Sequence, residues 1–347
     1  MKKKIKIAVV GIGLMGQQHI RAILKSPKAK LHSLIDVNPK AKFFSKRYKT
    51  KYFKNIPELL EKDKPDAAII ATPNKFHEIH ARYFLKEKIP ILLEKPITNS
   101  IQSAKRIISF SKLNKTPLLI GYHRRHNLIT SSLKKIILSG KLGKIISVHV
   151  MCWLYKHKEY FKEKWRTTKG GGPIAINLVH EIDMICYLLG PVKYVQAFKT
   201  NKTRKFKVED TAAIILEFHS GALCTLNISD TIVSPWSYEL TAGENPMYPK
   251  TNQSAYFFGG TKSSFQFPNI KKWYYKNDRS WWNKIFQHKE LNISKKDNDT
   301  LLNQINHFAE VALKKCTPKV SGIDGLISLK ILKSIYKSAD NGKKIKV

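Results

Sequence analysis

A lysine at position 95, in the stretch Glu94-Lys95-Pro96, lies downstream of a glycine-rich fingerprint at residues 11–16. The fingerprint has the spacing Gly-x-Gly-x-x-Gly, and Asp36 follows its last glycine by twenty residues. This spacing is typical of a dinucleotide-binding turn that is followed by an acceptor for a ribose hydroxyl. A lysine in that position can contact both a cofactor and a substrate hydroxyl. The residues therefore indicate redox chemistry on an alcohol.

The three glycines of the fingerprint have separate physical roles. The first permits the tight turn, the second lets the backbone approach a pyrophosphate, and the third allows close packing of helix on strand. The N-terminus of the next helix then presents free N–H groups to the phosphates. We expect the whole segment to bind the cofactor: Gly11, Ile12, Gly13, Leu14, Met15 and Gly16.

The carboxylate of Asp36 is expected to select between the two nicotinamide dinucleotides. It would accept hydrogen bonds from the ribose hydroxyls and repel a 2′-phosphate, which favours NAD. Lys40 and Lys42 are close in sequence, so NADP stays the alternative. Further along the chain, Thr72, Pro73 and Asn74 follow a predicted strand, and ligands bind at that end of strands in open α/β sheets. We expect these three residues to contact the cofactor as well.

The first 125 residues alternate short β-branched runs with helical patterns. The predicted strands cover residues 5–10, 31–36, 67–71, 91–94 and 117–122. Such alternation predicts an α/β domain with a doubly wound parallel sheet, a Rossmann fold, over residues 1–125.

The pattern changes from residue 126, where consecutive alternating segments replace the strand–helix repeat. These segments cover residues 145–153, 192–199, 212–218 and 222–229, with helices at 128–138, 174–189 and 300–314. They predict an α+β domain over residues 126–347 with a large, mostly antiparallel open sheet. Residues 246–294 are aromatic-rich and predicted to be irregular. An open sheet face favours self-association, so we expect a homodimer or homotetramer.

The net charge of +38 comes from 63 basic and 25 acidic residues. The excess is mostly lysine, spread along the chain without a dominant cluster, which argues against a specific nucleic-acid partner and favours an anionic small-molecule substrate. No apolar run of roughly 18 residues indicates a membrane span. Four scattered cysteines indicate a reducing, cytoplasmic location. His77 and His80 are spaced i, i+3 but lack a nearby third ligand, so no metal site is predicted.

Taken together, the motifs resemble the Gfo/Idh/MocA oxidoreductase family. The matching pieces are the fingerprint, Ala71-Thr72-Pro73-Asn74 with His77, Glu94-Lys95-Pro96, residues 121–125, Gly170-Gly171-Gly172, His180-Glu181-Ile182-Asp183 and Val208-Glu209-Asp210-Thr211. The resemblance adds His77, Glu94 and Lys95 to the expected cofactor contacts. It also implies that Lys95 hydrogen-bonds the reacting oxygen and that His180 takes or delivers its proton, as acid–base catalysis requires.

The chain departs from the family at position 176. Many relatives carry an aspartate four residues before the histidine, and here that residue is Ile176. Two replacements stay open: Asn177 binds substrate without relaying a proton, or Asp183 orients the imidazole. Four further residues are expected substrate contacts, and an arginine among them can pair with a carboxylate: Arg124, Tyr155, Trp165 and Arg166.

The resemblance implies an NAD(P)-dependent dehydrogenase that acts on a secondary alcohol of a cyclic polyol, a sugar or a dihydrodiol-type hydroxy acid. Two alternatives remain at this point. The basic charge and the aromatic stretch near Trp281 are also compatible with a nucleotide-sugar dehydrogenase. The family also includes co-repressors, so the second alternative is a cofactor-binding regulator without catalytic activity.

Overall fold

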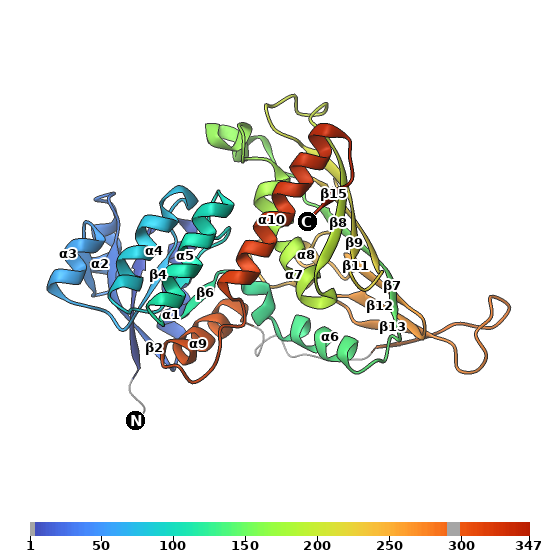
Figure 1. Ribbon diagram of the computed structural model, residues 1–347, viewed down its shortest axis with the longest axis horizontal. Coiled ribbons are helices and arrows are strands. Elements are labelled where there is room, and N and C mark those ends of the chain that lie inside the picture. Colours follow the sequence, from blue (N-terminus) through green and yellow to red (C-terminus); the bar gives the residue numbers. More distant parts are fainter. Residues whose placement is uncertain (1–3, 290–298) are drawn as a thin grey trace. The chain divides into compact units, whose positions relative to one another are not determined.

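The computed structural model describes residues 4–289 and 299–347 (Figure 1). They form two compact units. The first comprises the described residues up to Asn127 together with Asp299–Leu329, and the second comprises those from Leu128 together with Lys330–Val347. The sequence analysis assigned all of 126–347 to the second domain, whereas the structure groups 299–329 with the first unit. The reason is local packing, since helix α9 (Thr300–Ala312) lies against the first helix of the chain.

The first unit contains a six-stranded sheet in which all strands are parallel. The order is β3-β2-β1-β4-β5-β6, so the chain starts in the middle and winds out in both directions. This confirms the doubly wound sheet. The strands are β1 (Ile5–Val10), β2 (Ala29–Ile35), β3 (Lys51–Phe53), β4 (Ala67–Ile70), β5 (Ile91–Leu93) and β6 (Leu118–Ile120). The sequence predicted five of them to within a residue or two at each end, and missed the three-residue β3.

The helices of the first unit follow the strands in alternation. Helix α3 shows why the sequence specifies its start: the side chain of Asn55 accepts a hydrogen bond from the Glu58 N–H, and Pro57 occupies the first turn, where its missing N–H has no cost. The helices are between 7 and 13 residues long. They are α1 (Leu14–Lys25), α2 (Ala41–Arg47), α3 (Ile56–Lys62), α4 (His77–Lys86) and α5 (Ile101–Leu113), with 3₁₀ turns η1 (Asn74–Phe76) and η2 (His123–His126).

The second unit contains a nine-stranded sheet with the order β14-β13-β12-β11-β7-β10-β9-β8-β15. Neighbouring strands are antiparallel except β7 and β10, which run parallel. The mostly antiparallel sheet is therefore confirmed. The strands are β7 (Ile145–Trp153), β8 (Val192–Thr200), β9 (Thr211–Phe218), β10 (Leu223–Ser229), β11 (Tyr256–Gly260), β12 (Ser263–Phe267), β13 (Lys271–Tyr274), β14 (Phe286–Lys289) and β15 (Ile345–Lys346).

Helices accompany this second sheet. They are α6 (Leu128–Leu138), α7 (Val179–Leu189) and α8 (Tyr238–Ala242), with 3₁₀ turns η3 (Lys158–Lys162) and η4 (Lys164–Thr167) and a π-helical turn η5 (Ile174–Leu178). Helix α10 (Gly322–Asn341) runs from the first unit into the second. The sequence analysis predicted neither α10 nor the π-helical turn.

The prediction that residues 246–294 are irregular was wrong for four segments of that region. Strands β11 to β14 lie within it and extend the same sheet beyond β7, as the orange strands of Figure 1 show. Each strand is only four or five residues long, so the period-2 burial seen in β12 (Ser263–Phe267) spans too few residues to stand out in sequence. Residues 290–294 lie outside the described part of the chain.

Burial differs between the two sheets in the way their topologies require. Every residue of β4 is buried, because a parallel doubly wound sheet is covered on both faces. In β9, by contrast, Ile214 and Leu216 are buried while Ile215 between them is half exposed. One face of the second sheet therefore forms the core and the other presents apolar side chains to solvent.

Candidate active site

The glycine fingerprint has the geometry expected of a phosphate-binding turn. Gly11 has a positive φ of 88°, and a Cβ there would lie 2.7 Å from the carbonyl oxygen of Ala71. A Cβ on Gly16 would collide with the backbone of Gly11. Gly13 has open space around it and precedes α1 without a side-chain cap. Gly11 and Gly16 are thus required by packing, while Gly13 leaves room for a ligand at the helix N-terminus.

Asp36 lies beside this turn at the carboxyl end of β2. Its Oδ2 accepts a hydrogen bond of 2.7 Å from the Ile12 N–H, and its Oδ1 accepts one of 2.9 Å from the Asn38 N–H. The hydroxyl of Tyr52 donates to the Asp36 carbonyl. These bonds hold the carboxylate next to the fingerprint, which fits a ribose-binding role.

The turn after β4 is built around His77. This imidazole is buried, and its two nitrogens lie 2.9 Å from the Thr72 carbonyl oxygen and 3.1 Å from the Pro96 carbonyl oxygen. Burial lowers the pKa of His77. The side chain of Thr72 lies 3.0 Å from Nδ1 of His80. His77 therefore connects the turn at residues 72–74 to the turn after β5, and its contact with the cofactor stays a prediction.

The carboxylate of Glu94 is buried and has two partners. Its Oε1 lies 2.8 Å from Nε2 of His19 on α1, and its Oε2 accepts the backbone N–H of Lys95 at 3.1 Å. Burial by itself raises the pKa of Glu94, but the His19 hydrogen bond and the charges of His19, Lys95 and His123 hold the pKa below its ordinary value. A Cβ on Gly121 would lie 2.9 Å from this carboxyl group, so the space is fully used. Glu94 thus holds the backbone N–H of Lys95, and its contact with the cofactor stays a prediction.

Arg124 and Arg125 are both buried at the 3₁₀ turn η2. Nη1 of Arg125 donates to Oδ1 of Asp324 at 3.1 Å and to the Lys319 carbonyl at 3.4 Å. Arg125 therefore anchors the segment that leads into α10. Arg124, the expected substrate contact, is 3% exposed.

The residues expected to handle the proton lie together in the second unit. Asn177 belongs to the π-helical turn η5, and His180 lies in the first turn of α7, both half-buried. Asp183 is one turn further along α7 and is buried. The side-chain oxygen of Asn177 is buried and accepts no hydrogen bond within the described residues. A π-helical turn is uncommon and is found most often at functional sites.

Three of the expected substrate contacts, Tyr155, Trp165 and Arg166, also belong to the second unit. The guanidinium carbon of Arg166 lies 4.0 Å from the ring centroid of Tyr160 and 5.4 Å from that of Trp165, and its Nη1 donates to the Tyr160 carbonyl at 2.7 Å. Trp165 and Tyr155 are each more than half exposed. The structure thus joins Trp165 and Arg166 in one cation–aromatic cluster.

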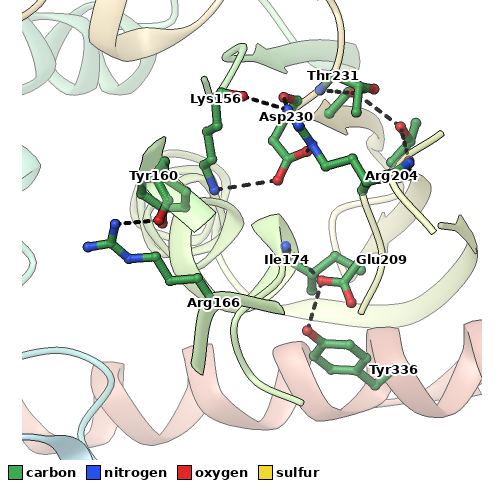
Figure 2. A network of polar contacts seen from close by, with 12 residues as sticks. Lys156, Tyr160, Arg166, Ile174, Arg204, Glu209, Asp230, Thr231 and Tyr336 are labelled. Atoms are coloured by element: carbon green, nitrogen blue, oxygen red, sulfur yellow. Dashed lines mark hydrogen bonds and ion pairs between the residues drawn. The ribbon is translucent and has the colours of Figure 1, made fainter. Parts of the chain in front are cut away.

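Figure 2 shows a second group of charges beside this cluster, which the sequence did not reveal. Lys156 is buried, with its Nζ 3.8 Å from Oδ2 of Asp230 and 4.8 Å from the ring centroid of Tyr160. Nε of Arg204 donates to Asp230 at 2.6 Å, and its guanidinium lies 5.6 Å from the Tyr155 ring. Burial lowers the pKa of Lys156 and raises that of Asp230. No spacing signal could have found this pair, since 74 residues separate its members.

Two groups of three potential metal ligands occur among the described residues: His307, Glu310 and Cys316, and Cys152, Glu181 and Glu239. In the first, the Lys319 N–H donates to Nε2 of His307, which places the ring proton on the nitrogen that faces Cys316. In the second, the Tyr256 hydroxyl already donates to Glu181. Neither arrangement favours a cation, and the absence of a metal site stays a prediction.

Lys95 and His180 belong to different compact units, the first at the end of β5 and the second on α7. Their meeting at one substrate stays a prediction. Two residues that were not selected from the sequence contact the expected site residues in the structure. His19 orients Glu94, and Glu209 contacts the π-helical turn. His19 could have been noted from its place three residues after the fingerprint, on the buried face of α1.

Family models match both halves of the chain, and named relatives share part of its sequence. Residues 5–122 match the model of the oxidoreductase family with an NAD-binding Rossmann fold, and residues 134–347 match the C-terminal α/β domain of that family. The inositol 2-dehydrogenase of Corynebacterium glutamicum is 28% identical over 251 residues, which cover 67% of this chain and 69% of the relative. The glucose-6-phosphate 3-dehydrogenase of Bacillus subtilis is 26% identical over 220 residues, 61% of each chain.

Solved structures share the same fold over nearly the whole chain. The WlbA dehydrogenase of Bordetella pertussis, crystallised with NADH and UDP-GlcNAcA, has a TM-score of 0.81 at 24% identity and 99% coverage of both chains. The scyllo-inositol dehydrogenase of Lactobacillus casei has a TM-score of 0.80 at 19% identity, with 99% coverage of each.

Among the residues that the structure describes, no helix has both the length and the apolar character needed to cross a bilayer. The two family matches cover most of the chain and agree with the parallel sheet, the fingerprint geometry and the mixed second sheet. The protein belongs to the Gfo/Idh/MocA oxidoreductase family, and its first domain is the NAD-binding Rossmann fold of that family.

Proposed function

We propose that this protein is a dehydrogenase that uses NAD(H) to interconvert a secondary alcohol and a ketone on a sugar, a cyclic polyol or a related hydroxy acid. The observation that carries the proposal is the fixed placement of Lys95. It stands at the end of β5 in an NAD-binding domain, and the buried Glu94 carboxylate holds its backbone N–H. Asp36, held beside the fingerprint, supports NAD over NADP.

The chemistry assigns separate tasks to the two domains. A hydroxyl whose carbon loses hydride must also lose its proton, so a nearby cation and a proton acceptor both lower the barrier. The bound nicotinamide supplies the hydride chemistry, and the protein supplies position and field. In our proposal the Lys95 ammonium hydrogen-bonds the reacting oxygen and the His180 imidazole accepts or returns its proton. Such acid–base help is typically worth about 10² to 10⁴ in rate.

Asn177 takes a binding role in this scheme. It lacks an ionisable group and so cannot relay a proton, but its side-chain oxygen is buried and free of partners within the described residues. A substrate hydroxyl that donates to this oxygen would satisfy it. Tyr155, Trp165, Arg166 and Arg124 remain proposed contacts for the rest of the substrate, with an arginine suited to a carboxylate or phosphate.

The test is a panel of inositols, aldoses, aldose phosphates and hydroxy acids with NAD and NADP, followed by absorbance of the reduced nicotinamide. Once one compound turns over, Lys95→Ala should lower kcat at least about 100-fold and leave NADH binding unchanged. Lys105→Ala, an exposed lysine on α5, is the matched control. Unchanged turnover in Lys95→Ala would remove Lys95 from the mechanism.

A nucleotide-sugar dehydrogenase is the second candidate. It is supported by the fold shared with the WlbA dehydrogenase, which was crystallised with UDP-GlcNAcA and aligns over 99% of both chains. UDP separates the two candidates. A nucleotide-sugar enzyme should be inhibited competitively by micromolar UDP, whereas an enzyme for free sugars or polyols should be indifferent to it. A cytoplasmic location and self-association complete the proposal.

A further inference from the structure

The carboxylate of Glu209 lies against the start of the π-helical turn in the second unit. Its Oε1 accepts a hydrogen bond of 3.1 Å from the Ile174 N–H and another of 3.0 Å from the Tyr336 hydroxyl (Figure 2). Glu209 is buried. The first N–H groups of a helix have no partner within the helix, so an acceptor from elsewhere in the fold is needed here. Glu209 supplies it from the loop before β9.

The glycine run at residues 170–172 makes room for this carboxylate. A Cβ on Gly172 would collide with the carboxyl group of Glu209, and a Cβ on Gly171 would collide with the backbone of Trp165 and Arg166. Gly172 has no positive φ, so an alanine there is excluded by the neighbouring carboxylate and not by its own backbone. Gly172 and Glu209 therefore form one packed pair, 37 residues apart in sequence.

The turn held in this way bears the residues assigned to the substrate. Asn177 is part of the π-helical turn, and His180 follows within the first turn of α7, with no break between the two helices. Because a helix is rigid over a few residues, the place of its first N–H determines where the next two turns project their side chains. A π-helical turn departs from α-geometry and persists where the surroundings hold it.

We propose that Glu209 is a positioning residue, whose carboxylate fixes the π-helical turn and thereby the placement of Asn177 and His180. The assignment of those two residues to the substrate rests on the proposed function; the hold of Glu209 on the turn does not. The Glu209 side chain is the acceptor in its hydrogen bonds with Ile174 and Tyr336, and burial raises its pKa. A neutral acceptor of the same shape should therefore serve.

The first experiment measures the turn itself in the full-length protein without substrate or cofactor. In hydrogen–deuterium exchange, Glu209→Ala should speed exchange of the amides at 174–180 by about tenfold to a hundredfold, the factor for one lost hydrogen bond to an acidic acceptor. Glu209→Gln should stay close to wild type, and so should Tyr336→Phe, which keeps the bond to Ile174. Glu217→Ala, at the opposite end of β9, is the matched control. Unchanged exchange in Glu209→Ala, or fast exchange in Glu209→Gln, would overturn the proposal.

The second experiment tests the packed pair by a double-mutant cycle. Gly172→Ala should displace the carboxylate and by itself speed exchange of the same amides. In Gly172→Ala/Glu209→Ala the shortened side chain leaves space for the new methyl group, so the double variant should exchange no faster than Glu209→Ala alone. Effects that simply multiply would mean that the two positions act independently, and would refute the contact as the cause.

Turnover supplies a readout that a role in stability alone would not move. With the compound found in the substrate panel, Glu209→Ala should lower kcat about tenfold or more, leave the affinity for NADH unchanged, and recover in Glu209→Gln. A normal kcat in a variant with fast exchange at 174–180 would refute the positioning role. If no compound turns over at all, the proposed function fails, while the exchange data still decide whether Glu209 fixes the turn.

Discussion

Nε2 of His19 lies 2.8 Å from Oε1 of Glu94, and both side chains are buried. His19 belongs to the helix that opens at the glycine fingerprint, and Glu94 directly precedes Lys95. The pair therefore connects the cofactor-binding helix to the backbone of the lysine proposed to hold the reacting oxygen. Removing one partner of a buried hydrogen bond leaves the other polar group unsatisfied, which costs more than the bond itself contributes.

Replacement of His19 should accordingly destabilise the first unit. We expect His19→Leu to lower the free energy of unfolding by about 2–4 kcal/mol, because the buried Glu94 carboxylate would lose its side-chain hydrogen-bond partner. Urea denaturation followed by circular dichroism measures the change. His219→Leu, at an exposed histidine in the β9–β10 hairpin, should stay within about 0.5 kcal/mol of wild type. The double variant His19→Leu/Glu94→Met, which removes both charges, should recover much of the loss; a loss equal to the sum of the single variants would contradict this account.

Asp36 should determine which dinucleotide binds. Asp36→Asn keeps the shape of the side chain but removes the charge that accepts ribose hydroxyls and repels a 2′-phosphate. We expect NADH affinity to fall about tenfold and NADPH affinity to rise, as measured by nicotinamide fluorescence titration. Asp63→Asn, at another carboxylate of the first unit, controls for the change in net charge. If the affinities for NADH and NADPH changed equally, Asp36 would only support the loop, through its hydrogen bonds to Ile12 and Asn38.

Glu78 should stabilise the protein near neutral pH and lose this effect in acid. Arg106 donates to both oxygens of this carboxylate at 2.6 and 2.8 Å, and this contact, with the Ser103 hydroxyl, lowers the pKa of Glu78 to about 2. A carboxyl whose pKa is lower in the folded protein stabilises it above the unfolded value, and the stabilisation is lost as the pH falls toward the folded value. The melting temperature of Glu78→Gln should therefore lie below that of the wild type at pH 6. The difference should disappear as the pH falls from about 4.5 to 2. A difference in melting temperature that does not change with pH would exclude the charge of Glu78 as its cause.

Self-association should occur through the open face of the second sheet. Phe198 on β8 is 65% exposed, and Ile215 on β9 and Leu223 on β10 are about half exposed on the same face. A contiguous apolar face of this kind is usually covered in the assembled protein. Light scattering at micromolar concentration should show a dimer or tetramer, and Phe198→Asp should shift it toward the monomer. Phe43→Asp, at an equally exposed phenylalanine on α2, should not. A wild-type monomer would refute the prediction.

Local signals were sufficient for most of the first domain. The parallel strands are continuous apolar runs, and the fingerprint, Asp36 and the cap at Asn55 each act over a few residues, so their spacing alone predicts their geometry. The lysine in Glu94-Lys95-Pro96 could be selected in the same way, since it follows a strand whose carboxyl end must face the ligand.

Contacts between residues that are far apart in the chain could not be predicted from the sequence. The strands β11 to β14 are too short to show a period, and they are stable only because β7 offers an edge on which to pair. Chain order alone assigns residues 299–329 to the second domain, whereas packing of α9 on α1 groups them with the first compact unit.

The amino-acid sequence by itself thus identified the groups available for chemistry: an NAD-binding turn, a lysine at a strand end and a histidine in the second domain. Tertiary structure alone decided which neighbours control those groups. The Glu94 carboxylate contacts both His19 and the Lys95 N–H, and the Glu209 carboxylate contacts the π-helical turn in space that Gly172, without a Cβ, leaves free. The physical reason is that a buried carboxylate takes its partners from whatever the fold brings within hydrogen-bonding distance, and residues 75 or 35 positions apart carry no local signal of that meeting.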